Sequence, residues 1–170
     1  MKIPYKYKKI IPNILTCFRL VIAPVILIFG LLNQVTIVLI LTIIGSITDL
    51  LDGYLARKWQ VTGQLGAKLD AVSDKVFASS LLLALTKKSS ILLIVFTLEI
   101  IIGIMNLYYY KNLKKSETLF IGKVKTTFLF VLIVISFIYA FLSKLDFLVL
   151  GLSYATINLQ ILVIISYTLN

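Results

Sequence analysis

Six long apolar runs fill most of this chain of 170 residues. Each run is close to the roughly 20 residues that an α-helix needs to cross the hydrocarbon core of a bilayer. Because no water is present there, a spanning segment must satisfy its own backbone N–H and C=O groups, which a helix does. The runs occupy residues 11–32, 35–57, 66–86, 89–110, 124–143 and 147–168. We therefore predict an all-α integral membrane protein with six transmembrane helices.

The basic residues predict how these helices are oriented. Of the 17 lysines and arginines, only Lys87, Lys88 and Lys144 lie in loops on the opposite side of the membrane from the N-terminus. Since cytoplasmic loops carry the excess of Lys and Arg, we expect both termini in the cytoplasm of a multi-pass cell-membrane protein. Residues 1–10 alternate Lys with Tyr and Ile and are expected to form a short interfacial segment. Residues 11–170 are expected to form one domain.

The composition restricts the chemistry that is possible. The chain has no histidine and a single cysteine, so it offers no imidazole base, no imidazole metal ligand and no thiolate cluster. Carboxylates and lysines remain. The net charge of +10 comes mainly from lysines that flank apolar segments, so we expect anionic lipid headgroups as partners and no nucleic acid.

Four of the seven acidic residues fall within residues 49–74. A carboxylate at membrane depth is costly and therefore marks a functional site. Asp49 and Asp52 are three positions apart, and Asp70 and Asp74 are four apart, so each pair shares one face of its helix. If the two helices face each other, four carboxylates meet at one point, which only cations make tolerable.

Carboxylates without a soft ligand nearby suit hard divalent cations such as Mg²⁺ or Mn²⁺. Two such ions can clamp the attacking and leaving oxygens of a displacement at phosphorus. Gly53 and Ala56 keep the same helix face small, and Arg57 supplies a planar donor fork for phosphate oxygens. The pattern indicates a slot for a phosphorylated ligand at the cytoplasmic end of the second and third helices.

This spacing resembles the signature of the CDP-alcohol phosphatidyltransferase family. The matching residues are Asp49, Asp52, Gly53, Ala56, Arg57, Gly66, Asp70 and Asp74. Eight residues at set spacing are much more specific than a lone glycine motif. The resemblance implies a membrane enzyme that transfers the phosphatidyl group of CDP-diacylglycerol to a small alcohol and releases CMP.

Two further segments resemble one branch of that family, the bacterial phosphatidylglycerophosphate synthases. They are residues 12–19 (PNILTCFR) and residues 121–127 (IGKVKTT). The implied acceptor is glycerol 3-phosphate. This branch often carries an Arg-Glu pair in the fourth helix, where this chain has Leu98 and Glu99. The acceptor therefore stays open, and phosphatidylglycerol (for cardiolipin) and an inositol phosphate are the alternatives.

The resemblance also implies roles for single residues and an assembly. Asp49, Asp52, Asp70 and Asp74 would hold two Mg²⁺ or Mn²⁺ ions. Asp74 would also be the catalytic base that deprotonates the acceptor hydroxyl. CDP-diacylglycerol would contact Gly53, Ala56, Arg57, Asn13 and Thr16, and the acceptor phosphate would contact Lys123 and Lys125. A homodimer is expected, because members of the family tend to form one.

Other interpretations of these residues remain open. Intramembrane acids also gather along ion pathways, so the alternative outside the enzyme class is a small cation carrier. Lys123 and Lys125 could contact lipid headgroups instead of an acceptor. Asn13 and Thr16 could cap the first helix instead of binding a nucleotide.

Overall fold

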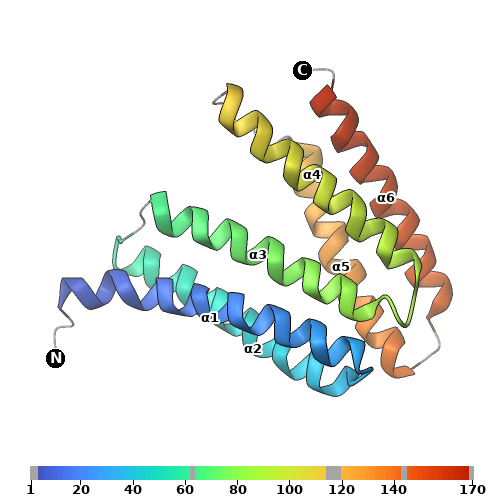
Figure 1. The fold of residues 1–170 in the computed structure, drawn as a ribbon, viewed down its shortest axis with the longest axis horizontal. Helices are drawn as coiled ribbons and strands as arrows, with labels where there is room; N and C mark the ends of the chain where they lie inside the picture. Colours follow the sequence, from blue (N-terminus) through green and yellow to red (C-terminus); the bar gives the residue numbers. More distant parts are fainter. Residues whose placement is uncertain (1–3, 62–63, 114–119, 143–144, 169–170) are drawn as a thin grey trace. The chain divides into compact units, whose positions relative to one another are not determined.

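The computed structural model describes residues 4–61, 64–113, 120–142 and 145–168, and every regular element in that part of the chain is an α-helix (Figure 1). The helices are α1 (Tyr5–Leu31), α2 (Val35–Lys58), α3 (Gln64–Leu85), α4 (Ile91–Leu113), α5 (Phe120–Leu142) and α6 (Asp146–Thr168). The prediction of an all-α protein is confirmed. Each helix coincides with one of the six apolar runs, apart from a few residues at its ends.

Five of these helices are long and apolar enough to cross a membrane. The five segments are Ile10–Leu31, Val35–Lys58, Ile91–Tyr108, Ile121–Leu142 and Asp146–Thr168. The protein is therefore a multi-pass membrane protein. Helix α3 differs because it carries four charged residues before residue 76 and is mainly apolar after it. These residues are Lys68, Asp70, Asp74 and Lys75.

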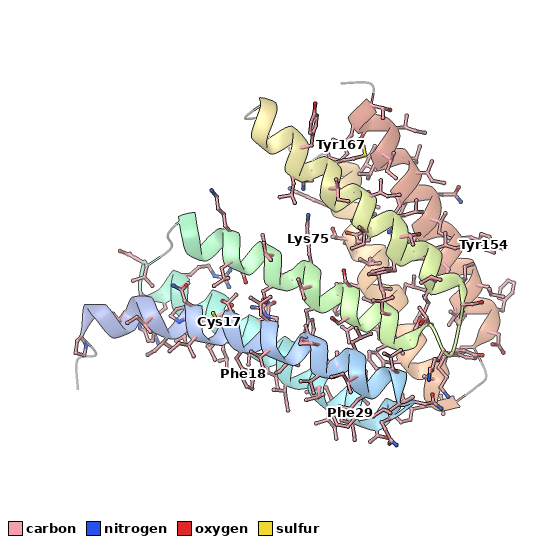
Figure 2. All side chains as sticks on the ribbon, viewed as in Figure 1. Cys17, Phe18, Phe29, Lys75, Tyr154 and Tyr167 are labelled. Carbon is pink, nitrogen blue, oxygen red and sulfur yellow. The ribbon has the colours of Figure 1, made fainter. Side chains whose placement is uncertain are left out.

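Large apolar side chains cover the outer faces of the helices, as expected for surfaces in contact with lipid (Figure 2). Phe18 on α1 is 47% exposed and Tyr154 on α6 is 61% exposed, and both project away from the helices that carry them (Figure 2). The buried residues are mostly aliphatic, but several polar and charged side chains are buried with them. These buried polar groups are candidates for function or for ties between helices.

Helix α1 begins within residues 1–10, the segment that we expected to lie in the interface, and the apolar span itself starts at Ile10. Helix α1 runs without interruption from Tyr5 through Pro12 and Pro24. Asn13 and Thr16 thus lie inside the helix, well after its first turn, where they cannot cap its N-terminus. The capping part of that alternative is wrong, although the Thr16 hydroxyl does lie 3.0 Å from the neighbouring Pro12 carbonyl oxygen, within hydrogen-bond distance.

The chain divides into two compact units, residues 1–84 and 85–170. In the first, α1 and α2 form a hairpin whose turn uses Asn33 in the left-handed conformation (φ 60°), which asparagine tolerates. The turn is closed by hydrogen bonds from the Asn33 N–H to the Gly30 carbonyl and from the Gln34 N–H to the Phe29 carbonyl, both 2.9 Å long.

Two glycines let α3 pack closely on this hairpin. A Cβ atom at Gly30 would lie 2.3 Å from the Cβ of Ala84, and one at Gly45 would lie 2.4 Å from the ring of Phe77. Both distances are far shorter than any carbon–carbon contact allows. Both contacts involve the second half of α3. Nearer its start, the helix meets α1 through the Ser73 hydroxyl and through the ion pairs of Asp70 and Asp74 with Arg19.

The second unit is built from α4, α5 and α6. Its interior contains fully buried aliphatic side chains such as Leu92, Val95 and Leu132. It also contains buried polar side chains from α5 and α6, namely Lys125, Ser136, Ser153, Thr156 and Gln160. Polar groups in such an interior need hydrogen-bond partners. Lys125 and Gln160 find theirs on α4. The Thr156 hydroxyl bonds its own helix, and the Ser136 and Ser153 hydroxyls have no hydrogen-bond partner among the described residues.

Candidate active site

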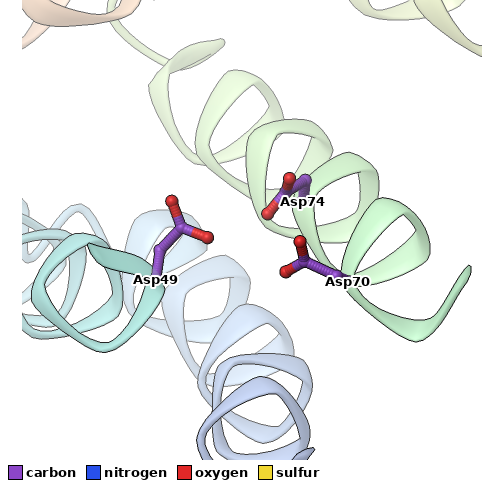
Figure 3. Close-up of side chains that lie close together, drawn as sticks. All are labelled: Asp49, Asp70 and Asp74. Atoms are coloured by element: carbon purple, nitrogen blue, oxygen red, sulfur yellow. The ribbon is translucent and has the colours of Figure 1, made fainter. Parts of the chain in front are cut away.

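Helices α2 and α3 bring the two acidic pairs of the sequence together. Asp49 of α2 faces Asp70 and Asp74 of α3 (Figure 3). One carboxylate oxygen from each of these three residues lies within 4.8 Å of the others. Their side chains are 44–55% exposed, so a ligand can reach them. The i, i+3 and i, i+4 spacing places the acids on the facing surfaces of the two helices.

Asp52 lies deeper than the other three and is held by α1. Its side chain is only 3% exposed. The hydroxyl of Thr16 lies 2.9 Å from Oδ2 of Asp52 and 3.0 Å from the carbonyl oxygen of Pro12, and it can donate its single proton to either. The Ser73 hydroxyl donates to the backbone carbonyl of Thr16 over 3.2 Å, which ties α3 to the same point of α1.

Arg19 of α1 lies at the centre of this candidate site, although the sequence analysis did not select it. Its side chain is 1% exposed, and its guanidinium makes ion pairs with all four aspartates. Nη2 lies 2.6 Å from Oδ2 of Asp52 and 3.3 Å from Oδ1 of Asp70, while Nη1 bonds Asp49 and Asp74. Its spacing from Thr16, three positions earlier on the same helix face, is the signal that could have identified it.

The donor set fits divalent cations. It consists only of carboxylate oxygens, which Mg²⁺ and Mn²⁺ prefer. Magnesium binds oxygen at about 2.0–2.1 Å, so ligands on opposite sides of one ion are roughly 4 Å apart. The 4.8 Å that spans the oxygens of Asp49, Asp70 and Asp74 needs only a small contraction to meet that value. Four carboxylates against one guanidinium leave about three negative charges for cations to balance.

The residues predicted to bind the nucleotide lie near the ends of the same helices. Arg57 folds back along α2, so that a Cβ at Gly53 would lie 3.7 Å from its Nη2. Ala56 is half-buried beside them. Across the unit, a Cβ at Gly66 would lie 3.2 Å from Oδ1 of Asn13. The small residues therefore leave room beside one guanidinium and one amide, both of which can donate to phosphate or base oxygens.

The two lysines predicted to bind the acceptor have different surroundings on α5. Lys123 is exposed. Lys125 is buried, and its ammonium lies 2.6 and 2.7 Å from the two carboxylate oxygens of Glu99 on α4. Gln160 of α6, another residue that the sequence analysis missed, donates to the same carboxylate over 3.1 Å. Leu98, which precedes Glu99, supplies no charge to this group.

Comparison with known proteins identifies similar chains. The sequence model of a family described as CDP-alcohol phosphatidyltransferase matches residues 9–166. A CDP-diacylglycerol–glycerol-3-phosphate 3-phosphatidyltransferase of Mycoplasma genitalium is 32% identical over 160 residues, and the match covers 79% of this chain and 68% of that one. Proteins of the same name from Haemophilus influenzae and Aquifex aeolicus are 40% and 38% identical over 80 and 76 residues, or 45% of this chain and 43% of each relative. No solved structure matches the chain.

Proposed function

This chain belongs to the CDP-alcohol phosphatidyltransferase family, and we propose that it transfers the phosphatidyl group of CDP-diacylglycerol to glycerol 3-phosphate. The products are phosphatidylglycerophosphate and CMP. The observation that carries the proposal is the convergence of the four motif aspartates at one point between α2 and α3. The relatives' names, which specify glycerol 3-phosphate, support the choice of acceptor.

In the proposed reaction, Asp49, Asp52, Asp70 and Asp74 would hold two divalent cations, which when bound would offset charge on the pyrophosphate. Asp74 has the most exposed of the four carboxylates and accepts the proton of the acceptor hydroxyl. The acceptor oxygen then bonds to the phosphorus that carries diacylglycerol, and the bond from that phosphorus to CMP breaks. Buried Asp52 keeps its orientation through Thr16.

The nucleotide side of the site is assigned to Gly53, Ala56, Arg57, Asn13 and Thr16. Arg57 is exposed and presents a planar fork that can bond two phosphate oxygens at once. The missing side chain at Gly53 leaves the ligand room to approach the backbone beside this guanidinium. Thr16 serves this side of the site indirectly, since its hydroxyl is directed toward Asp52 and Pro12.

The acceptor phosphate needs a cation, and the two lysines of α5 are the candidates. Lys123 is exposed and can approach a soluble anion directly. The Lys125 ammonium already donates to both carboxylate oxygens of Glu99. Lys125 could therefore bind phosphate only if it released that carboxylate. We therefore assign the larger share of acceptor binding to Lys123.

We further propose that α3 crosses the bilayer as a sixth helix and that both termini lie in the cytoplasm, as the positions of the basic residues favour. The aspartates then open to the cytoplasm, where a soluble acceptor and CMP can enter and leave. A homodimer in the cell membrane is the proposed assembly.

An acceptor screen tests the proposed function. Purified full-length protein in detergent is supplied with CDP-diacylglycerol, Mn²⁺ and one of three acceptors: glycerol 3-phosphate, phosphatidylglycerol or an inositol phosphate. CMP release and lipid mass spectrometry are expected to show product with glycerol 3-phosphate only. Product with another acceptor instead would identify that molecule as the substrate in place of glycerol 3-phosphate. No CMP with any of them would contradict the enzymatic role, and cation flux into proteoliposomes that depends on Asp70 would support the carrier.

The lysine assignment has a separate kinetic test. Lys123→Ala is expected to raise the KM for glycerol 3-phosphate while leaving the KM for CDP-diacylglycerol unchanged. Lys87→Ala is the matched control, because Lys87 is an exposed lysine in a loop on the proposed opposite side of the membrane. Equal KM values for Lys123→Ala and the control would place the acceptor site elsewhere.

A further inference from the structure

Arg19 is a fully buried arginine whose hydrogen bonds within the described part of the chain all go to the four aspartates. Its Nε atom is buried and has no hydrogen-bond partner. Among the residues that the structure describes, the guanidinium is therefore held in place by the four carboxylates and by no backbone carbonyl.

The bonds of Arg19 use carboxylate oxygens that a divalent cation would need. Nη1 bonds the Oδ1 atoms of Asp49 and Asp74, and Nη2 bonds Oδ1 of Asp70 and Oδ2 of Asp52. A guanidinium keeps oxygens further apart than an ion does, since hydrogen bonds are about 2.7–2.9 Å long and Mg²⁺–oxygen bonds about 2.0–2.1 Å. Two positive groups among the same oxygens would also repel each other strongly in this half-buried setting.

We propose that Arg19 is the internal counter-cation of the metal-free site and that divalent cations displace its guanidinium from the carboxylates. This inference rests on the proposed metal site. Without ions, Arg19 prevents four carboxylates from repelling one another and keeps α1 closed on α2 and α3. When ions bind, they neutralise the carboxylates that hold Arg19, so the guanidinium withdraws. The free energy of metal binding is then reduced by the free energy of the Arg19–carboxylate bonds that are broken. The metal affinity is therefore weaker than the four aspartates would give without Arg19.

The test compares full-length wild type with Arg19→Gln in detergent, first with chelator and then in a titration with Mn²⁺ alone. In chelator, Arg19→Gln is expected to melt at a lower temperature, because the carboxylates lose their counter-charge. Electron paramagnetic resonance of free Mn²⁺ is expected to show about tenfold tighter binding by the variant, since the competing cation is gone. Mn²⁺ should also raise the melting temperature of Arg19→Gln by more than it raises that of wild type.

Two further variants keep the test decisive. Arg57→Gln removes the same group from an exposed position and is expected to leave Mn²⁺ affinity nearly unchanged. Arg19→Lys keeps the charge on an ammonium that reaches fewer carboxylates, so it should remain folded even if Arg19→Gln does not, with an intermediate Mn²⁺ affinity. If both Arg19 variants bind Mn²⁺ no more tightly than wild type, Arg19 does not compete with the metal and the proposal is refuted.

The result also separates this inference from the proposed function. If wild type binds no Mn²⁺, the metal site of the proposed function fails, whatever Arg19 does. If wild type binds Mn²⁺ and Arg19→Gln in chelator melts no lower than wild type, the metal site stands and the counter-cation role is refuted.

Discussion

Lys125 and Glu99 form a buried ion pair in which the lysine ammonium lies 2.6 and 2.7 Å from the two carboxylate oxygens. Gln160 donates its amide N–H groups to the same carboxylate and to the backbone carbonyl of Val95, over 3.1 and 3.0 Å. One carboxylate thus ties together α4, α5 and α6. The pair gives Glu99, the single acidic residue of α4, its opposite charge.

Glu99→Gln is expected to destabilise the protein, because it leaves the Lys125 ammonium buried without an opposite charge. Removing one partner of a buried pair costs about 3–5 kcal/mol. Thermal unfolding in detergent measures the loss. The double variant Glu99→Gln with Lys125→Met removes both charges and should regain most of the stability. A single variant as stable as wild type would show that the pair contributes nothing to the fold.

Thr16→Val should weaken the first unit at almost constant side-chain volume. The change deletes the hydroxyl that reaches Asp52, and a hydrogen bond to a charged group contributes about 1.5–3 kcal/mol. Unfolding in chelator, where no metal compensates, reports the effect. Thr126→Val is the control, because that hydroxyl is exposed and bonds carbonyls of its own helix. Equal melting temperatures for the two variants would argue against a role for Thr16 in holding Asp52.

Asp74→Asn separates the base from the metal ligand. Loss of a general base lowers the rate by about 10²–10⁴. CMP release should therefore remain low even at saturating Mn²⁺, while the melting temperature changes little. If saturating Mn²⁺ restores the rate, Asp74 serves only as a ligand. Asp146→Asn, which changes an exposed acid at the start of α6, is expected to leave CMP release unaltered.

Gly30→Ala tests the close approach of α1 and α3. The added methyl group would lie 2.3 Å from Cβ and 2.5 Å from Cα of Ala84, so the helices must move apart. Overpacking of this kind costs about 1–3 kcal/mol. Gly151→Ala meets nothing within 4 Å and should be neutral or stabilising. Ala84→Gly should restore the stability of Gly30→Ala only in part, because the added methyl group still lies 2.5 Å from Cα of residue 84. Complete rescue would mean that the two backbones are further apart than this distance implies.

The helices and the acidic pairs could be predicted because both depend on local spacing. A run of apolar residues long enough to span lipid must form a helix, and residues three or four apart must share a face. Asp49 with Asp52, and Asp70 with Asp74, followed directly from those two rules. The same local rules could not tell that α1 continues back to Tyr5, since residues 4–10 are too polar to extend the apolar run.

Partners across helices could not be predicted in this way. Arg19 is 30 to 55 positions from the acids that it contacts, and Gln160 is 61 positions from Glu99. The sequence by itself determined which helices form, the family, and which carboxylates lie on which face. Only the tertiary structure decided that an arginine occupies the centre of the carboxylates and that Lys125 is neutralised. The physical reason is that a buried charge is stabilised by whichever opposite charge the packing of helices brings within reach, and nothing in local spacing specifies that neighbour.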